Sequence, residues 1–167
     1  MFKGADIVRD AVGRVHDEMW GDDARMMNFG GNLEQEPIGY QEKVHDLIEK
    51  AGERVRFYGA YQNREMPKLM ELADWTIIPS IWWENSPIVI QEAFFHARPM
   101  ICSNIGGMAA KITDGVNGLH FRFGISEALA HRLLAALPDN HLSYRLRERS
   151  PCPPPSFHSA HTDLAPY

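Results

Sequence analysis

The sequence contains few cysteines, no long apolar run and no excess of basic residues. Cys102 and Cys152 are the only cysteines among 167 residues, and their separation fits neither a disulfide framework nor a Cys-x-x-Cys metal site. No stretch approaches the roughly 18 apolar residues of a membrane-spanning helix. The first residues also lack the apolar centre of a secretory signal. The formal net charge of -5 disfavours general nucleic-acid binding, which usually needs a basic face. These absences predict a cytoplasmic protein with no transmembrane segment and no nucleic-acid partner.

The residues that are present suit an α/β domain. Apolar residues make up 44% of the chain, which is enough for one domain with a buried core. Apolar spacing and turn residues predict strands over 25–30, 55–59, 75–79, 99–103 and 119–121, and helices over 4–15, 40–51, 65–73, 87–97, 106–112 and 126–137. Ser86 is predicted to cap the helix that begins at Pro87, and Ser126 is predicted to cap the last helix. Repeated strand–helix units predict a doubly wound parallel sheet.

The final segment differs from the rest of the chain. Residues 138–167 hold six of the eleven prolines and show no sustained apolar period. We therefore expect a domain over residues 1–137, followed by an irregular proline-rich tail over 138–167.

In a doubly wound sheet, ligands bind beyond the carboxyl ends of the strands. That rule directs attention to the residues after the predicted strands, and the longest motif lies at one of these positions. It reads Pro79-Ser80-Ile81-Trp82-Trp83-Glu84-Asn85-Ser86-Pro87-Ile88-Val89-Ile90-Gln91-Glu92-Ala93. Three further blocks accompany it, namely Val55-Arg56-Phe57-Tyr58-Gly59, Ser103-Asn104-Ile105-Gly106-Gly107 and Asp114-Gly115-Val116-Asn117-Gly118-Leu119.

The four blocks resemble, in order and spacing, the Glu-x7-Glu signature region of retaining GT-B glycosyltransferases. The resemblance covers about residues 3–137 and implies a Rossmann-like domain that binds a nucleotide diphosphate sugar. It also implies different tasks for the two carboxylates. Glu92 would accept hydrogen bonds from the ribose hydroxyls, and Glu84 would contact the transferred sugar. The plainer alternative is two surface carboxylates beside a core helix.

The same resemblance suggests which groups meet the diphosphate. Backbone N–H groups around Asn85, Ser86 and Pro87 lie at a predicted helix start, where unpaired donors favour an anion. The Gly106-Gly107 pair lets backbone approach a ligand closely, although it could be a plain turn. Lys3 belongs to a short lysine-glycine block whose lysine, by resemblance, contacts the diphosphate and stabilises its departure. Lys3 and Glu84 are thus the expected catalytic residues.

The aromatic pair beside Glu84 has two interpretations. Trp82 and Trp83 could wall the sugar pocket, whereas packing against the sheet is the commoner role for such side chains.

Several features depart from the family pattern. Ala110 stands where the family commonly has a glutamate. The family's acceptor-binding domain and the first strand of its donor domain have no counterpart in this sequence. Since that strand lies near the middle of the sheet, we expect unpaired strand edges and an uncovered apolar helix face.

The sequence therefore predicts a glycosyltransferase donor domain that serves transfer of a hexosyl-type group with retention. The acceptor could be a glycan or a lipid-linked sugar. No cofactor is expected beyond the donor substrate, and no metal, because the sequence has no Asp-x-Asp motif. The alternative is a non-catalytic nucleotide-sugar-binding fragment, or a subunit of a split transferase. A nicotinamide-binding domain is disfavoured because no G-x-G-x-x-G follows the first strand.

Overall fold

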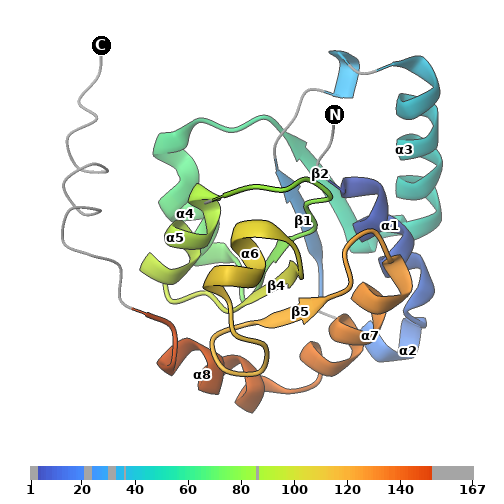
Figure 1. Ribbon diagram of the computed structural model, residues 1–167. Coiled ribbons are helices and arrows are strands. Elements are labelled where there is room, and N and C mark those ends of the chain that lie inside the picture. The colour runs from blue at the N-terminus through green and yellow to red at the C-terminus, as the bar shows by residue number, and fades with distance from the viewer. Residues whose placement is uncertain (1–3, 21–23, 30–32, 36, 86, 152–167) are drawn as a thin grey trace, which may run out of the picture.

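Helices and strands alternate along the chain, as the sequence predicts (Figure 1). The computed structural model describes residues 4–20, 24–29, 33–35, 37–85 and 87–151. The strands are β1 (Met26–Phe29), β2 (Val55–Gly59), β3 (Thr76–Ile78), β4 (Met100–Ser103) and β5 (Leu119–Phe121). The α-helices are α1 (Ala5–Arg14), α2 (Asp17–Trp20), α3 (Ile38–Ala51), α4 (Met66–Leu72), α5 (Ile88–Phe95), α6 (Gly106–Lys111), α7 (Ser126–Ala136) and α8 (Asn140–Glu148). Three short 3-10 turns are η1 (Leu33–Gln35), η2 (Gly52–Arg54) and η3 (Asn63–Glu65). Each observed strand lies within its predicted range.

The strands form two parallel sheets. One sheet pairs β1 with β2, and the other has the order β3-β4-β5. Met26 lies opposite Val55 in the first sheet, and Ile101 lies between Ile77 and Leu119 in the second. Among the described residues, β1 and β3 each have a strand partner on one edge only. This arrangement confirms the predicted α/β fold with parallel strands.

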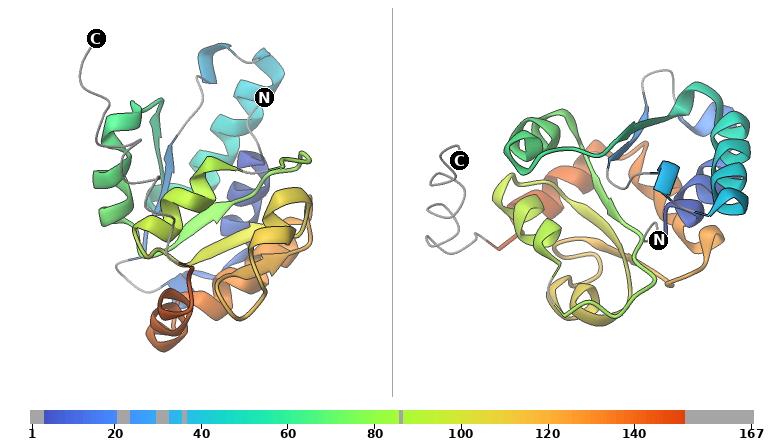
Figure 2. Two further views of the ribbon diagram at one scale, coloured as in Figure 1. Left: turned by 60° about the vertical axis from the view of Figure 1, so that its left-hand side comes forward. Right: turned by 90° about the horizontal axis from the view of Figure 1, so that it is seen from above.

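Strand β4 shows why the fold needs helices on both faces. All of its residues are buried, and successive side chains point to opposite faces. Ile101 packs in a cluster with α1 and α7, whereas Met100 and Cys102 pack with α4, α5 and α6. Figure 2 shows helices on both sides of the strands. Burial raises the pKa of the Cys102 thiol to about 12, with a smaller contribution from the Asp114 charge. Cys102 is therefore a core residue rather than a reactive one.

The segment after residue 137 corrects one expectation. Residues 140–148 are not irregular but form α8, where the Asp139 carboxylate accepts a hydrogen bond from the Leu142 N–H at 2.9 Å. Leu146 is fully buried in the same cluster as α1 and α7. The helix is short and mostly polar, so its sequence shows little period, and tertiary packing stabilises it. Residues 152–167 of the predicted tail lie outside the described residues.

The start of α7 corrects a second expectation. Ser126 is the first helical residue, and Ile125 occupies the cap position without a side-chain cap bond. The Ser126 hydroxyl instead donates to the Asp10 carboxylate of α1. The serine thus joins two helices that cover the same face of the sheet.

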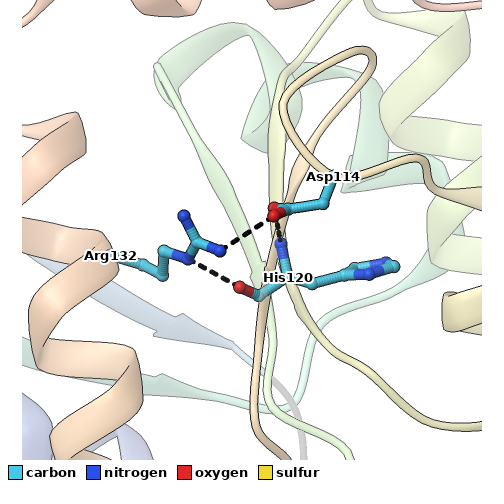
Figure 3. A network of polar contacts seen from close by, with 3 residues as sticks. All are labelled: Asp114, His120 and Arg132. Carbon is cyan, nitrogen blue, oxygen red and sulfur yellow. Dashed lines mark hydrogen bonds and ion pairs between the residues drawn. The ribbon is translucent and has the colours of Figure 1, made fainter.

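A polar network holds the loop before β5 against α7 (Figure 3). The Asp114 carboxylate accepts hydrogen bonds from the His120 N–H at 2.7 Å and from Arg132 Nη2 at 2.9 Å. Arg132 Nε donates to the His120 carbonyl at 2.7 Å. In the same loop, Asn117 Oδ1 accepts from the Thr113 N–H at 2.7 Å. The Asp-Gly-Val-Asn-Gly block is therefore a structural turn that fixes β5.

Replacing Arg132 with methionine should lower the free energy of unfolding by about 1 kcal/mol. The change removes two hydrogen bonds from a partly exposed guanidinium and leaves the Asp114 carboxylate with one fewer donor. Urea unfolding followed by circular dichroism measures the effect. Arg14→Met is the matched control, because Arg14 meets Asp10 in an exposed pair within one helix and should cost only about 0.3 kcal/mol. Equal losses in the two variants would contradict a special role for the network.

Among the described residues, no helix combines the length and the apolar character needed to cross a bilayer.

Candidate functional site

The end of β3 positions the first carboxylate of the motif. Ser80 is buried, with 1% of its surface exposed. Its hydroxyl donates to Glu84 Oε1 at 3.0 Å and accepts from the Trp82 N–H at 3.3 Å. These bonds fold the chain back so that the Glu84 side chain lies over the strand end. The proline-serine strand end of the motif therefore orients the carboxylate.

The glycine pair lies directly beneath the Glu84 loop. The Gly107 N–H donates to the Glu84 carbonyl at 2.5 Å. A Cβ at Gly106 would lie 2.8 Å from the Glu84 carbonyl oxygen, and a Cβ at Gly107 would overlap the Asn85 carbonyl group. Gly106 also has a φ of +55°, in the region that favours glycine. The backbone that closely approaches this glycine pair is therefore that of Glu84 and Asn85. Contact between the glycine pair and a ligand stays a prediction.

The start of α1 is packed just as tightly at the end of β3. Gly4 has a φ of +83°, and a Cβ there would overlap the Pro79 carbonyl oxygen. The lysine-glycine block therefore places the N-terminus of α1 beside the strand end that leads to Glu84. Lys3 itself lies outside the described residues.

The second carboxylate lies in the interior. Glu92 is on α5 with 9% of its surface exposed, between the buried residues Ile90 and Ala93. Tyr61, which follows β2, lies close enough for its titration to respond to this carboxylate. Burial raises the pKa of the Tyr61 phenol, and the negative charge of Glu92 raises it further. A buried carboxylate beside a phenol can accept hydrogen bonds from hydroxyl groups.

Tyr61 belongs to an aromatic group that the sequence analysis did not single out. Phe29, at the end of β1, stacks on Tyr58 with ring centroids 4.9 Å apart, and meets Tyr61 edge-on at 6.4 Å. These residues stand at or just after the ends of neighbouring strands, which is the signal that could have identified them. They place aromatic faces on the Glu92 side of the site.

One cavity connects the Glu84 loop with Tyr61. Tyr61, Ser80, Glu84 and Pro87 all line a cavity of about 910 Å³ between the two sheets. Its end near these residues lies at the carboxyl edge of the strands, where ligands of doubly wound sheets bind.

The two tryptophans before Glu84 do not pack against the sheet. Trp82 and Trp83 are 53% and 75% exposed, and Ile88 at the start of α5 is 65% exposed. All three are exposed apolar side chains within four residues of Glu84 in the sequence.

The structure brings four of the predicted site residues into contact. Glu84 and Asn85 contact Gly106 and Gly107. Glu92 does not line the cavity, and its charge acts on Tyr61, which does. Pro87 is buried and occupies the cap position of α5, one residue before the helical position expected for it. The first N–H groups of a helix have no intrahelical acceptor, so the missing N–H of proline breaks no helical hydrogen bond at either position. Ser86, the predicted cap, lies outside the described residues. In the part of the chain described, no group of three His, Cys, Asp or Glu side chains could hold a metal ion.

Helices on both faces of parallel strands, with carboxylates and glycines at the strand ends, define a Rossmann-like domain of the GT-B type. Residues 1–139 match the family described as "Glycosyl transferases group 1". The chain belongs to this glycosyltransferase family.

Similar proteins agree with that assignment. The D-inositol 3-phosphate glycosyltransferase of Corynebacterium glutamicum is 27% identical over 150 residues, which are 88% of this chain and 35% of the relative. The lipopolysaccharide 1,2-N-acetylglucosaminetransferase of Salmonella typhimurium is 28% identical over 105 residues, 62% of this chain and 28% of the relative.

Among solved structures, Anabaena HepE in complex with UDP-glucose superposes with a TM-score of 0.76 and 25% identity. The superposition covers 89% of this chain and 39% of HepE. The glycosyltransferase WaaG gives a TM-score of 0.70 at 22% identity, with 89% of this chain and 38% of WaaG covered. The chain therefore spans well under half the length of these relatives.

Proposed function

We propose that this chain binds a nucleotide diphosphate sugar and serves as the donor-binding half of a retaining glycosyltransferase. The observation that carries the proposal is that Glu84 and Tyr61 line one cavity, while the charge of the buried Glu92 acts on Tyr61. Glu84 is held over a strand end by Ser80, and Glu92 is buried beside Tyr61. The HepE structure, which is similar in fold, contains UDP-glucose, and this supports the choice of ligand class.

The two carboxylates have separate tasks in this proposal. Glu92 accepts hydrogen bonds from the ribose hydroxyls, because a carboxylate offers several acceptor positions to a vicinal diol. The aromatic side chains of Phe29, Tyr58 and Tyr61 supply flat apolar faces for the base. Glu84 contacts the transferred sugar, and the exposed Trp82 lies next to it.

The proposed roles of the charged groups follow from the charges that develop during glycosyl transfer. When the bond between the anomeric carbon and the diphosphate oxygen breaks, positive charge develops on the sugar and negative charge on the leaving group. Glu84 stabilises the first, while Lys3 and the N–H groups at the start of α5 stabilise the second. The acceptor hydroxyl then gives its proton to the departing diphosphate oxygen, and its oxygen bonds to the anomeric carbon on the face that the leaving group occupied. The acceptor is held by a second domain across a cleft that excludes water.

A panel of UDP-glucose, GDP-mannose and ADP-glucose tests donor binding. We expect one of them, at about 100 times its dissociation constant, to stabilise the chain by about 2.7 kcal/mol and to raise Tm by roughly 5–10 °C. Differential scanning fluorimetry and titration calorimetry measure the effect. Absence of binding by all three would contradict the proposal. Turnover by this chain with no added partner would refute the alternative of a non-catalytic module.

A further inference from the structure

The loop between β3 and α5 exposes two indole rings on a backbone that is held in place. Trp82 and Trp83 are 53% and 75% exposed. The Ser80 hydroxyl accepts from the Trp82 N–H at 3.3 Å and donates to Glu84 Oε1 at 3.0 Å. The Trp83 Cα lies 3.5 Å from a Cβ built at Gly106. Both side chains are therefore exposed although neighbouring groups fix the backbone that carries them.

The two indoles lie outside the cavity that Glu84 lines. Ser80 and Glu84 line that cavity, whereas Trp82 and Trp83, which are among the described residues of the same loop, do not. In the proposed function, Glu84 contacts the transferred sugar of a nucleotide sugar that fills the donor site. An acceptor therefore has to reach that sugar from outside the donor site. Residues that lie outside the cavity and directly precede Glu84 are in position to contact the acceptor.

The groups at this place define the chemistry of what binds there. Two adjacent exposed tryptophans keep a large apolar area in water, and such areas mark sites of contact. Polar residues follow them directly in the chain, since Glu84 is half-buried and Asn85 is exposed. A ligand that covers the indoles consequently meets flat apolar rings together with a carboxylate and an amide, which require hydrogen bonds.

A pyranose ring meets both demands. One face of the ring carries C–H groups that pack on an aromatic ring, and its hydroxyl groups hydrogen-bond with carboxylates and amides. An alkyl chain covers the indoles but cannot hydrogen-bond with Glu84 or Asn85. We propose that Trp82 and Trp83 bind a pyranose ring of the acceptor, so that the acceptor is recognised as a carbohydrate rather than through an alkyl chain. This inference rests on the proposed function and adds the chemical class of the acceptor to it.

Saturation-transfer NMR on the whole chain tests the inference. The chain is first saturated with the nucleotide sugar that binds in the donor panel, so that the donor site is occupied. The probes are methyl α-glucopyranoside, methyl α-mannopyranoside and 1-hexanol. At least one glycoside should bind with a dissociation constant of about 1–10 mM, with the transfer strongest at the C–H protons of one ring face. Hexanol should show no saturable binding over the same concentrations.

Two double variants separate stacking on a flat ring from apolar contact in general. Trp82→Leu combined with Trp83→Leu keeps apolar side chains but removes the rings, and should weaken glycoside binding at least about fivefold. Trp82→Phe combined with Trp83→Phe keeps aromatic faces and should stay within about threefold of the parent. Tyr144→Leu is the matched control, because it removes a ring that is 61% exposed on α8, and it should leave binding unchanged. All of these side chains are exposed, so the fold should be retained.

The possible failures can be told apart. Leucine variants that bind the glycosides as tightly as the phenylalanine variants would overturn the inference, and so would hexanol binding that the leucine variants retain. A chain that binds a nucleotide sugar but neither glycoside would overturn the inference and leave the proposed function intact. A chain that binds no nucleotide sugar would contradict the proposed function itself, and the inference would fall with it. Thermal shift measures donor binding and saturation transfer measures glycoside binding, so each failure has its own readout.

Discussion

Replacing Gly107 with alanine should lower the free energy of unfolding by about 3 kcal/mol. The added Cβ would overlap the Asn85 carbonyl group and press on the Glu84 carbonyl oxygen, both of which are backbone and cannot rotate away. The loop must then move, and the hydrogen bond from the Gly107 N–H to Glu84 must lengthen. Urea unfolding followed by circular dichroism measures the loss. Because Glu84 moves with the loop, the thermal shift with the nucleotide sugar should also fall.

Gly13→Ala is the matched control for this substitution. Gly13 lies inside α1, is exposed, and has no atom within 4 Å of a built Cβ. Alanine is a better helix former than glycine there, so the variant should gain about 0.5–1 kcal/mol. Opposite signs for the two glycines are therefore expected. A Gly107→Ala protein as stable as the parent would show that the loop adapts without cost.

Replacing Glu92 with glutamine should weaken binding of the nucleotide sugar by roughly 10- to 100-fold while the fold is retained. Glutamine keeps the size of the side chain but loses the charge that strengthens hydrogen bonds from hydroxyl groups. Titration calorimetry measures the affinity, and the melting temperature without ligand reports the fold. Glu42→Gln on the exposed side of α3 is the control and should leave the affinity unchanged.

The same variant has a second readout that needs no ligand. Burial is the main cause that raises the pKa of Tyr61, and the Glu92 charge is the other. Removing that charge should lower the pKa of Tyr61 towards its ordinary value, because a neutral neighbour no longer opposes formation of the phenolate. Ultraviolet absorbance titrations of the parent and of Glu92→Gln, each corrected with Tyr61→Phe, measure the difference. An unchanged pKa of Tyr61 together with unchanged affinity would contradict the proposed role of Glu92.

The sequence predicted the position of each strand because buried parallel strands are short apolar runs bounded by turn residues. It was less successful at helix ends. Ser126 looked like a cap residue, yet its hydroxyl bonds Asp10 in another helix. The helix over 140–148 escaped notice because the buried side chain of Leu146 contributes too little pattern to a polar segment. Such features depend on neighbours distant in the sequence.

The candidate site divides in the same way. The spacing of Glu84 and Glu92 and the order of the four blocks were visible in the sequence and led to the correct family. That the Gly106-Gly107 pair supports the Glu84 loop could not be predicted, since the clash that demands glycine comes from Asn85. Tyr61 was missed because its proximity to Glu92 joins the end of β2 to α5.

The sequence by itself determined the alternation of strands and helices, the glycosyltransferase family and the residues of the motif. Local propensity, apolar period and spacing are properties of the chain, so they can be recognised without coordinates. Only the tertiary structure decided which backbone atoms the glycines approach, that the Glu92 charge acts on Tyr61, and that residues of β1 and β3 line one cavity. Those properties depend on close packing between segments far apart in sequence, which no local pattern specifies.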